Sequence, residues 1–147
     1  MISIRDGFHR LWCGGRVGSY WRSPSAAETS IILELIRRAS LPALISQLEV
    51  ARVQNMDDGQ MGSLLVLPPG LSADATRRFG REVAELRFMD GDGVLISAAL
   101  NVDSDGNLFE LDMFKGDGSP LIRIPDALLV RLSIRLRAME WCDDGPA

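Results

Sequence analysis

The chain has 147 residues, of which 46% are hydrophobic and 24% charged, a composition typical of a globular protein long enough for one hydrophobic core. Its formal net charge is −4 with a pI near 5.0, and this acidic balance argues against binding nucleic acid by neutralising phosphates. No stretch approaches the roughly 18 apolar residues of a membrane span, so neither a membrane nor a nucleic acid is expected as a partner.

Neither the first residues nor the cysteines indicate export. Residues 1–10 lack the apolar core of a signal peptide. Cys13 and Cys142 stand near opposite ends of the chain, and without an export signal free thiols are favoured over a disulfide. We therefore expect a cytoplasmic protein that folds as a single domain over residues 1–147.

A helix is predicted directly after an irregular N-terminal segment, residues 1–22. Ser25 and Glu28 have the spacing of a capping box, in which each side chain accepts a hydrogen bond from the backbone N–H of the other residue. Apolar residues then recur at helical spacing from Ile31 until Pro42 interrupts the pattern. A short second helix is expected over residues 41–48.

Five β-strands are predicted in the middle of the chain, where apolar residues alternate with polar ones between turn signals. The signals are Asp-Gly pairs, which adopt the positive φ of hairpin turns at little cost. These pairs are Asp58-Gly59, Asp90-Gly91, Asp92-Gly93, Asp105-Gly106 and Asp117-Gly118. The predicted strands cover residues 49–55, 63–67, 81–90, 94–102 and 107–115. A polar loop or single helical turn is expected over 71–79, and a C-terminal helix over 126–140.

These elements predict an α+β fold: an antiparallel meander sheet of about five strands, with N-terminal and C-terminal helices packed on one face. Alternation assigns the side chains of the last three strands to two faces. The core face is expected to carry Ala84, Leu86, Phe88, Val94, Ile96, Ala98, Leu100, Val102, Phe109, Leu111 and Met113. On the last strand the opposite face is expected to carry Leu108, Glu110, Asp112 and Phe114. That second face is either solvated, with cross-strand ion pairs such as one made by Arg87, or a surface that binds a partner.

The residue types that catalysis or metal binding would need are scarce. His9 is the single histidine, and no motif near it would orient it for nucleophilic chemistry. Zinc needs three or four ligands at defined spacing, which this histidine and the two cysteines lack. The aspartates that begin at Asp103 fail the EF-hand pattern, because its sixth and twelfth positions hold Leu108 and Phe114. We expect no metal and no cofactor.

Paired carboxylates keep an enzyme as a third-ranked alternative. Glu110 and Asp112 are predicted to project from the same face of one strand, and two carboxylates at a suitable separation can carry out acid–base chemistry. Neighbouring exposed carboxylates are nevertheless common on protein surfaces. A protein without enzymatic activity is therefore favoured.

An ordered series of motifs runs through the central part of the chain. The motifs are Met56-Asp-Asp-Gly-Gln-Met-Gly-Ser-Leu64, Arg78-Phe-Gly80, Phe88-Met-Asp-Gly-Asp-Gly-Val94, Ala99-Leu-Asn-Val-Asp103, Leu108-Phe-Glu-Leu-Asp-Met-Phe-Lys115, Ser119-Pro-Leu-Ile122 and Ile124-Pro125. The series resembles a family of small bacterial domains of unknown function, with a DDGGMGSL turn, a D-DG hairpin and an ELD-WK-D-SPL strand and exit, over about residues 28–125. Two positions depart from the family, since Gln60 and Phe114 stand where it has Gly and Trp.

Domains of this sort look like those found beside polymorphic toxin genes, where small acidic α+β proteins neutralise a cognate toxin. The resemblance implies an immunity protein that binds a cytoplasm-acting toxin stoichiometrically and occludes its active site. The carboxylates expected to contact such a partner are Asp57, Asp58, Glu85, Asp90, Asp92, Glu110 and Asp112. The alternative is a non-catalytic regulatory or scaffold domain that binds a small ligand or a host protein.

Overall fold

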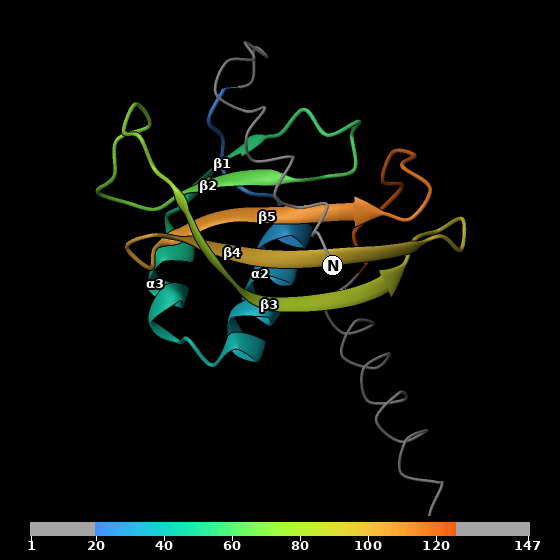
Figure 1. Ribbon diagram of the computed structural model, residues 1–147, viewed down its shortest axis with the longest axis horizontal. Helices are drawn as coiled ribbons and strands as arrows, with labels where there is room; N and C mark the ends of the chain where they lie inside the picture. The colour runs from blue at the N-terminus through green and yellow to red at the C-terminus, as the bar shows by residue number, and fades with distance from the viewer. Residues whose placement is uncertain (1–19, 126–147) are drawn as a thin grey trace, which may run out of the picture.

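The structure, a computed structural model, describes residues 20–125 (Figure 1). Its helices are α2 (Ala26–Ala39) and α3 (Ala43–Glu49). Its strands are β1 (Arg52–Asn55), β2 (Leu64–Leu67), β3 (Phe79–Met89), β4 (Leu95–Asp103) and β5 (Leu108–Lys115). The five predicted strands and the two helices before them are confirmed. The predicted helix over 126–140, both cysteines, His9 and most of the segment predicted to be irregular lie outside the described residues.

Helix α2 begins where the capping box predicts. Ser25 Oγ accepts a hydrogen bond from the N–H of Glu28 at 3.2 Å, and Glu28 Oε2 accepts one from the N–H of Ser25 at 2.7 Å. Arg22 pairs with the same carboxylate at 2.8 Å. The backbone of Arg22 also exchanges two hydrogen bonds with Val53, at 2.9 and 2.7 Å, so this residue of the segment predicted to be irregular forms a β-bridge with β1.

The five strands form one antiparallel sheet in the order β1-β2-β5-β4-β3. The last three strands are consecutive neighbours, as a meander requires. The hairpin of β1 and β2 joins the far side of β5, where Leu64 pairs with Leu111 and Leu65 pairs with Glu110. The predicted antiparallel α+β fold is therefore confirmed. Between β2 and β3 the chain crosses to the far edge of the sheet, and the space left between them is filled by β5 and β4, so β5 becomes an interior strand.

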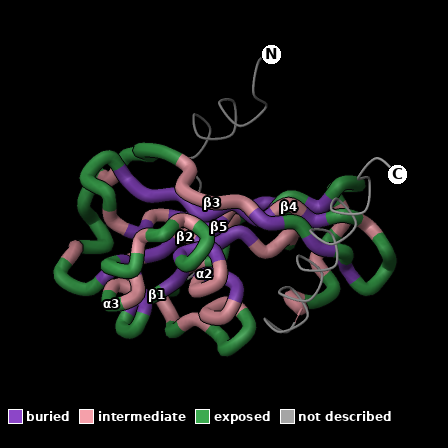
Figure 2. Tube along the Cα trace, turned by 90° about the horizontal axis from the view of Figure 1, so that it is seen from below, coloured by how far each residue is buried: buried purple, intermediate pink, exposed green. Residues whose placement is uncertain are grey.

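Both helices lie on one face of the sheet, behind the strands in Figure 1 and below them in Figure 2. Helix α2 contacts β3 and β4, and α3 contacts β5. The core between the two layers contains the fully buried Ile32, Leu35, Val53, Ile96 and Leu100. The predicted core face of β4 is confirmed from Ile96 to Val102. We call the opposite side of the sheet the second face; no described helix packs on it.

The predicted faces are wrong at the start of β5. Asn101 pairs with Glu110 and Val102 with Leu108, so Phe109 is an extra residue opposite β4. This β-bulge turns Leu108 into the core, where it is fully buried, and leaves Phe109 half-buried. The alternation fails here because the inserted residue shifts the period by one position.

Arg77 attaches the loop between β2 and β3 to the sheet. Its guanidinium donates to Asp103 Oδ2 at 2.9 Å, to the carbonyl of Val66 at 2.8 Å and to the carbonyl of Leu108. It also lies 5.1 Å from the ring centroid of Phe109, within the range of a cation–π contact. One arginine therefore joins three strands and holds the start of β3 in place.

Candidate functional site

Three loops meet at one end of the sheet, at the right of Figure 1, around a buried lysine. The loops are residues 56–63, 90–94 and 116–122. Lys115 is 1% exposed, and its ammonium group donates to Asp90 Oδ2 at 2.8 Å, to Asp92 Oδ2 at 2.7 Å and to the carbonyl of Pro120 at 3.1 Å. We call these four residues the Lys115 cluster. It unites residues from three of the sequence motifs.

The carboxylate of Asp90 accepts hydrogen bonds from the backbone as well as from Lys115. The donors are the N–H groups of Gly91 at 2.8 Å, Ile122 at 2.8 Å and Arg123 at 3.1 Å. Burial alone would raise the pKa of Asp90, but the bonds from Lys115 and from these N–H groups outweigh it and lower the pKa to about 2. Asp90 thus binds the segment that leaves β5.

The other two charged members of the Lys115 cluster also favour their ionised forms. The hydrogen bond from Lys115 lowers the pKa of Asp92. Burial would lower the pKa of Lys115, but its bonds to Asp90 and Asp92 outweigh burial and raise it. All three groups are therefore charged at neutral pH. General acid–base catalysis needs a group whose pKa lies near the working pH, so this cluster indicates a structural role.

The Lys115 cluster predicts a loss of stability in acid. The ordinary pKa of Asp90 is 3.8, and in the folded chain it is about 2. Between these values the unfolded state binds more protons, so stability falls as the pH falls through this window and is fully present above it. We expect the urea midpoint to fall between pH 5 and pH 2.5, and to fall less in Asp90→Asn, which has no carboxylate to protonate. An equal fall in both proteins would contradict this assignment.

Asp58 organises the loop between β1 and β2. Its carboxylate accepts hydrogen bonds from the N–H groups of Met61 at 3.0 Å and Ser63 at 2.8 Å, and the residue is only 8% exposed. Ser63 Oγ in turn accepts the N–H of Met113 at 2.9 Å, which ties the loop to β5. Gln60 has a φ of 64°, in the left-handed region that glycine adopts most easily. That geometry accounts for the glycine of the motif pattern at this position.

A row of one leucine and three polar residues crosses the second face over four strands. The row contains Leu65, Glu110, Asn101 and Glu82, from β2, β5, β4 and β3. Asn101 Nδ2 donates to Glu110 Oε1 at 2.8 Å, and both residues are 3% exposed. Glu110 is therefore an internal hydrogen-bond acceptor in this structure.

Toward the Lys115 cluster the second face becomes apolar and exposed. The successive cross-strand rows are Glu85–Ala99–Asp112, then Arg87–Ser97–Phe114, then Met89–Leu95. Met89, Leu95 and Phe114 are 57%, 39% and 56% exposed, and we call them the apolar triplet. Glu85 and Asp112 lie in the row beyond it, and Asp92 lies in the turn that follows Met89. Three exposed apolar side chains thus lie at one end of this face, with Arg87 and Ser97 in the same rows and carboxylates beside them.

Comparison with known proteins gives one family. Residues 21–125 match the family described as Domain of unknown function (DUF6984). The chain belongs to the DUF6984 family. No curated protein and no solved structure matches the chain. The resemblance to an uncharacterised domain family is confirmed. The DUF6984 segment holds both described helices, all five strands, the Lys115 cluster and the apolar triplet.

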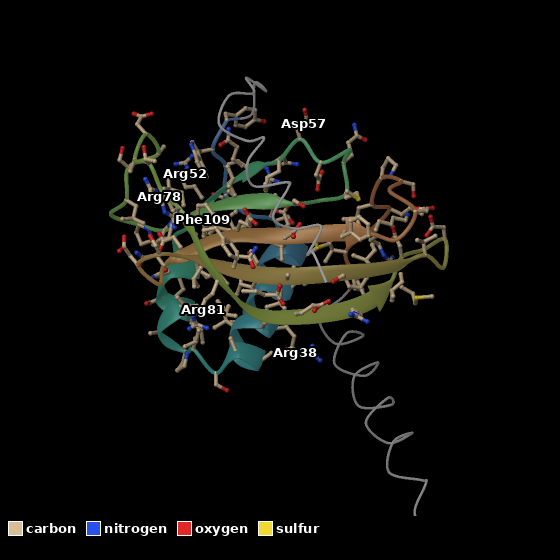
Figure 3. All side chains as sticks on the ribbon, in the orientation of Figure 1. Arg38, Arg52, Asp57, Arg78, Arg81 and Phe109 are labelled. Carbon is tan, nitrogen blue, oxygen red and sulfur yellow. The ribbon has the colours of Figure 1, made fainter. Side chains whose placement is uncertain are left out.

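Within this DUF6984 domain, the seven carboxylates predicted to contact a partner differ in burial. Asp58, Asp90 and Glu110 are buried, Glu85 and Asp112 are half-buried, and Asp57 and Asp92 are exposed. The buried three accept hydrogen bonds inside the chain. Figure 3 shows Asp57 at the outer margin, on the loop between β1 and β2.

If the second face is solvated, the sequence predicts ion pairs on it that involve Arg87. Glu85 forms such a pair with Arg87, although the two residues lie on the same strand and not on neighbouring strands. Its Oε1 lies 3.3 Å from Arg87 Nε and also accepts the hydroxyl of Ser97 at 2.6 Å. The apolar triplet was not among the predicted contact residues. The alternation of β5 was a usable signal, because it placed Phe114 on the same face as Asp112.

Residues 20–125 contain no group of three or more His, Cys, Asp or Glu side chains arranged to hold a metal ion. In the same part of the chain, neither helix has the length and apolar character needed to cross a membrane.

Proposed function

We propose that this DUF6984 protein is an immunity protein that binds a cognate toxin in a one-to-one complex and occludes its active site. The observation that carries the proposal is the apolar triplet on the second face. Exposed apolar clusters with a polar rim mark protein interaction sites, and aromatic anchors such as Phe114 commonly supply much of the binding energy. Among the described residues, Phe114 is more than half exposed.

Charge supports a basic partner for this surface. Glu85, Asp92 and Asp112 border the apolar triplet. Glu85 pairs with Arg87 and Asp92 pairs with Lys115, but Asp90 and Asp112 add two further carboxylates, so negative charge is in excess at this end of the sheet, as it is over the whole chain, whose net charge is −4. Complementary charge raises the rate of association and excludes wrong partners more than it raises affinity. We propose a toxin that acts in the cytoplasm and presents an apolar anchor among basic residues.

The proposal is tested by finding the partner and measuring its neutralisation. The tagged full-length chain is purified from its native host, and any protein that co-purifies in equal amount is expressed with and without the chain. We expect growth arrest by the partner alone, rescue by the chain, and a roughly nanomolar Kd by calorimetry, about −12 kcal/mol. A partner whose activity is unchanged by the chain would favour the regulatory or scaffold alternative, and no partner at all would contradict the proposal.

Replacing Phe114 by alanine should weaken the complex strongly without unfolding the chain. Loss of an aromatic anchor costs about 2 kcal/mol or more in binding, which is about 30-fold or more in Kd. The unfolding midpoint should change little, because Phe114 is 56% exposed. The matched control is Val50→Ala, an exposed apolar residue at the end of α3, away from the second face. Equal affinities for Phe114→Ala and the parent would remove the apolar triplet from the interface.

A further inference from the structure

Strand β3 is at the edge of the sheet that the described strands form. No described strand pairs with its outer side. The opposite edge, β1, is partly covered, because Val53 exchanges two backbone hydrogen bonds with Arg22. Unpaired edge strands present rows of N–H and C=O groups that can accept a further strand.

The regular part of this edge lies beside the apolar triplet. Register shifts interrupt the pairing of β3 with β4 near its start, whereas Ala84–Met89 pair with β4 without a break. The N–H of Asp90 points inward, because it donates to the carbonyl of Val94 at 2.9 Å. Backbone groups alternate along a strand at its edge, so those of Met89 and Arg87 point outward.

One outward carbonyl is already bonded. Arg38 of α2 donates to the carbonyl oxygen of Glu85 at 2.6 Å, and Figure 3 shows Arg38 beside this edge. The bond agrees with the alternation and marks where the open stretch begins. The backbone groups that remain for pairing are those of Arg87 and Met89. Outside β3 and β4, no backbone group of the described residues forms a hydrogen bond with them.

We propose that the protein partner adds an extended segment to β3 alongside Arg87 and Met89. This inference rests on the proposed function, because it states how the toxin is held. Met89 belongs to both the edge and the apolar triplet, so the added segment would continue the sheet and place alternate side chains against the triplet. Glu85, which pairs with Arg87, and Asp92, which pairs with Lys115, flank that position. Together with Asp90 and Asp112 they leave an excess of negative charge there, which favours a basic segment over an acidic one.

Proline at position 87 tests the edge directly. Arg87→Pro removes an N–H that points outward, so it removes none of the bonds between β3 and β4; proline is tolerated on edge strands at such positions. Arg87→Ala is the matched control, because it removes the same side chain and keeps the N–H. Each full-length variant is titrated by calorimetry with the toxin recovered in the one-to-one complex. We expect Arg87→Ala to bind within about twofold of the parent and Arg87→Pro to bind at least about tenfold more weakly.

Hydrogen exchange gives a second measurement that does not depend on how the proline variant folds. In the unaltered chain, the amides of Arg87 and Met89 should exchange readily when free and become protected in the complex. Equal affinities for the two variants, with no added protection, would overturn strand addition; the effect of Phe114→Ala would then show separately whether the proposed function stands. Protection that rises with the concentration of the chain alone would identify a second copy as the occupant and overturn the toxin assignment. Absence of any one-to-one partner would overturn both proposals.

Discussion

Asp90→Asn should destabilise the fold by about 3 kcal/mol, the lower end of the cost of removing one partner from a buried ion pair. The substitution removes a carboxylate that accepts a hydrogen bond from Lys115 at 2.8 Å. The same carboxylate accepts hydrogen bonds from the N–H groups of Ile122 and Arg123. Lys115 would remain buried, with Asp92 as its one remaining carboxylate in the cluster. Because small domains are stable by only about 5–15 kcal/mol, such a loss should be plain in urea unfolding at pH 7.

Asp92→Asn is the control for this effect. The Asp92 side chain bonds to the same ammonium group at 2.7 Å but is 36% exposed, so water can replace much of what it supplies. We expect a clearly smaller loss than in Asp90→Asn. Equal losses of stability in the two variants would show that the negative charge near Lys115 stabilises the fold and that the hydrogen bonds around Asp90 add nothing measurable.

Gly80→Ala should cost about 3 kcal/mol, because the added methyl group has no room between β3 and β4. A Cβ at this position would lie 2.2 Å from the carbonyl oxygen of Asp103 and 2.6 Å from its carbonyl carbon. Both are backbone atoms, so the strands must separate, as in other overpacked sites. The neighbouring hydrogen bond from Ser104 N–H to the carbonyl of Arg78, at 2.9 Å, would be strained as well.

Gly91→Ala is the matched control among the loop glycines. Its Cβ would meet Ile122 at 3.5 Å, an ordinary van der Waals contact, and its backbone is outside the left-handed region. We expect a change within about 0.5 kcal/mol in thermal or urea unfolding. A Gly80→Ala protein as stable as Gly91→Ala would mean that β3 can shift freely against β4.

Local signals were sufficient to predict most of the elements. The capping box at Ser25 fixed the start of α2, and the Asp-Gly pairs separated the strands where the structure has turns. These features depend on neighbours within a few residues, so the sequence shows them directly. The same holds for the core face of β4, where the pairing with β5 runs from Ile96 to Asn101 without a register shift.

Features that depend on distant residues could not be predicted in this way. The extra residue Phe109 has no local signature, and it reversed the faces at the start of β5. The pairing of β2 with β5 joins segments far apart in the chain. For the candidate site, the sequence showed which residues are carboxylates but not that Asp90 meets Lys115 or that Glu110 meets Asn101. The burial of Asp90 and Glu110 depends on these contacts with residues distant in the sequence.

The interior position of β5 has a consequence for how the chain acquires its structure during synthesis. The hairpin of β1 and β2 is synthesised before its neighbour β5. Until β5 forms, the side chains of Leu64 and Val66, which are buried in the complete sheet, lack that neighbouring strand. Pairings between distant segments form slowly, and exposed apolar strands invite aggregation meanwhile. We expect chains halted before Leu108 to lack a continuous sheet, because β5 is the strand that joins the hairpin of β1 and β2 to β4 and β3.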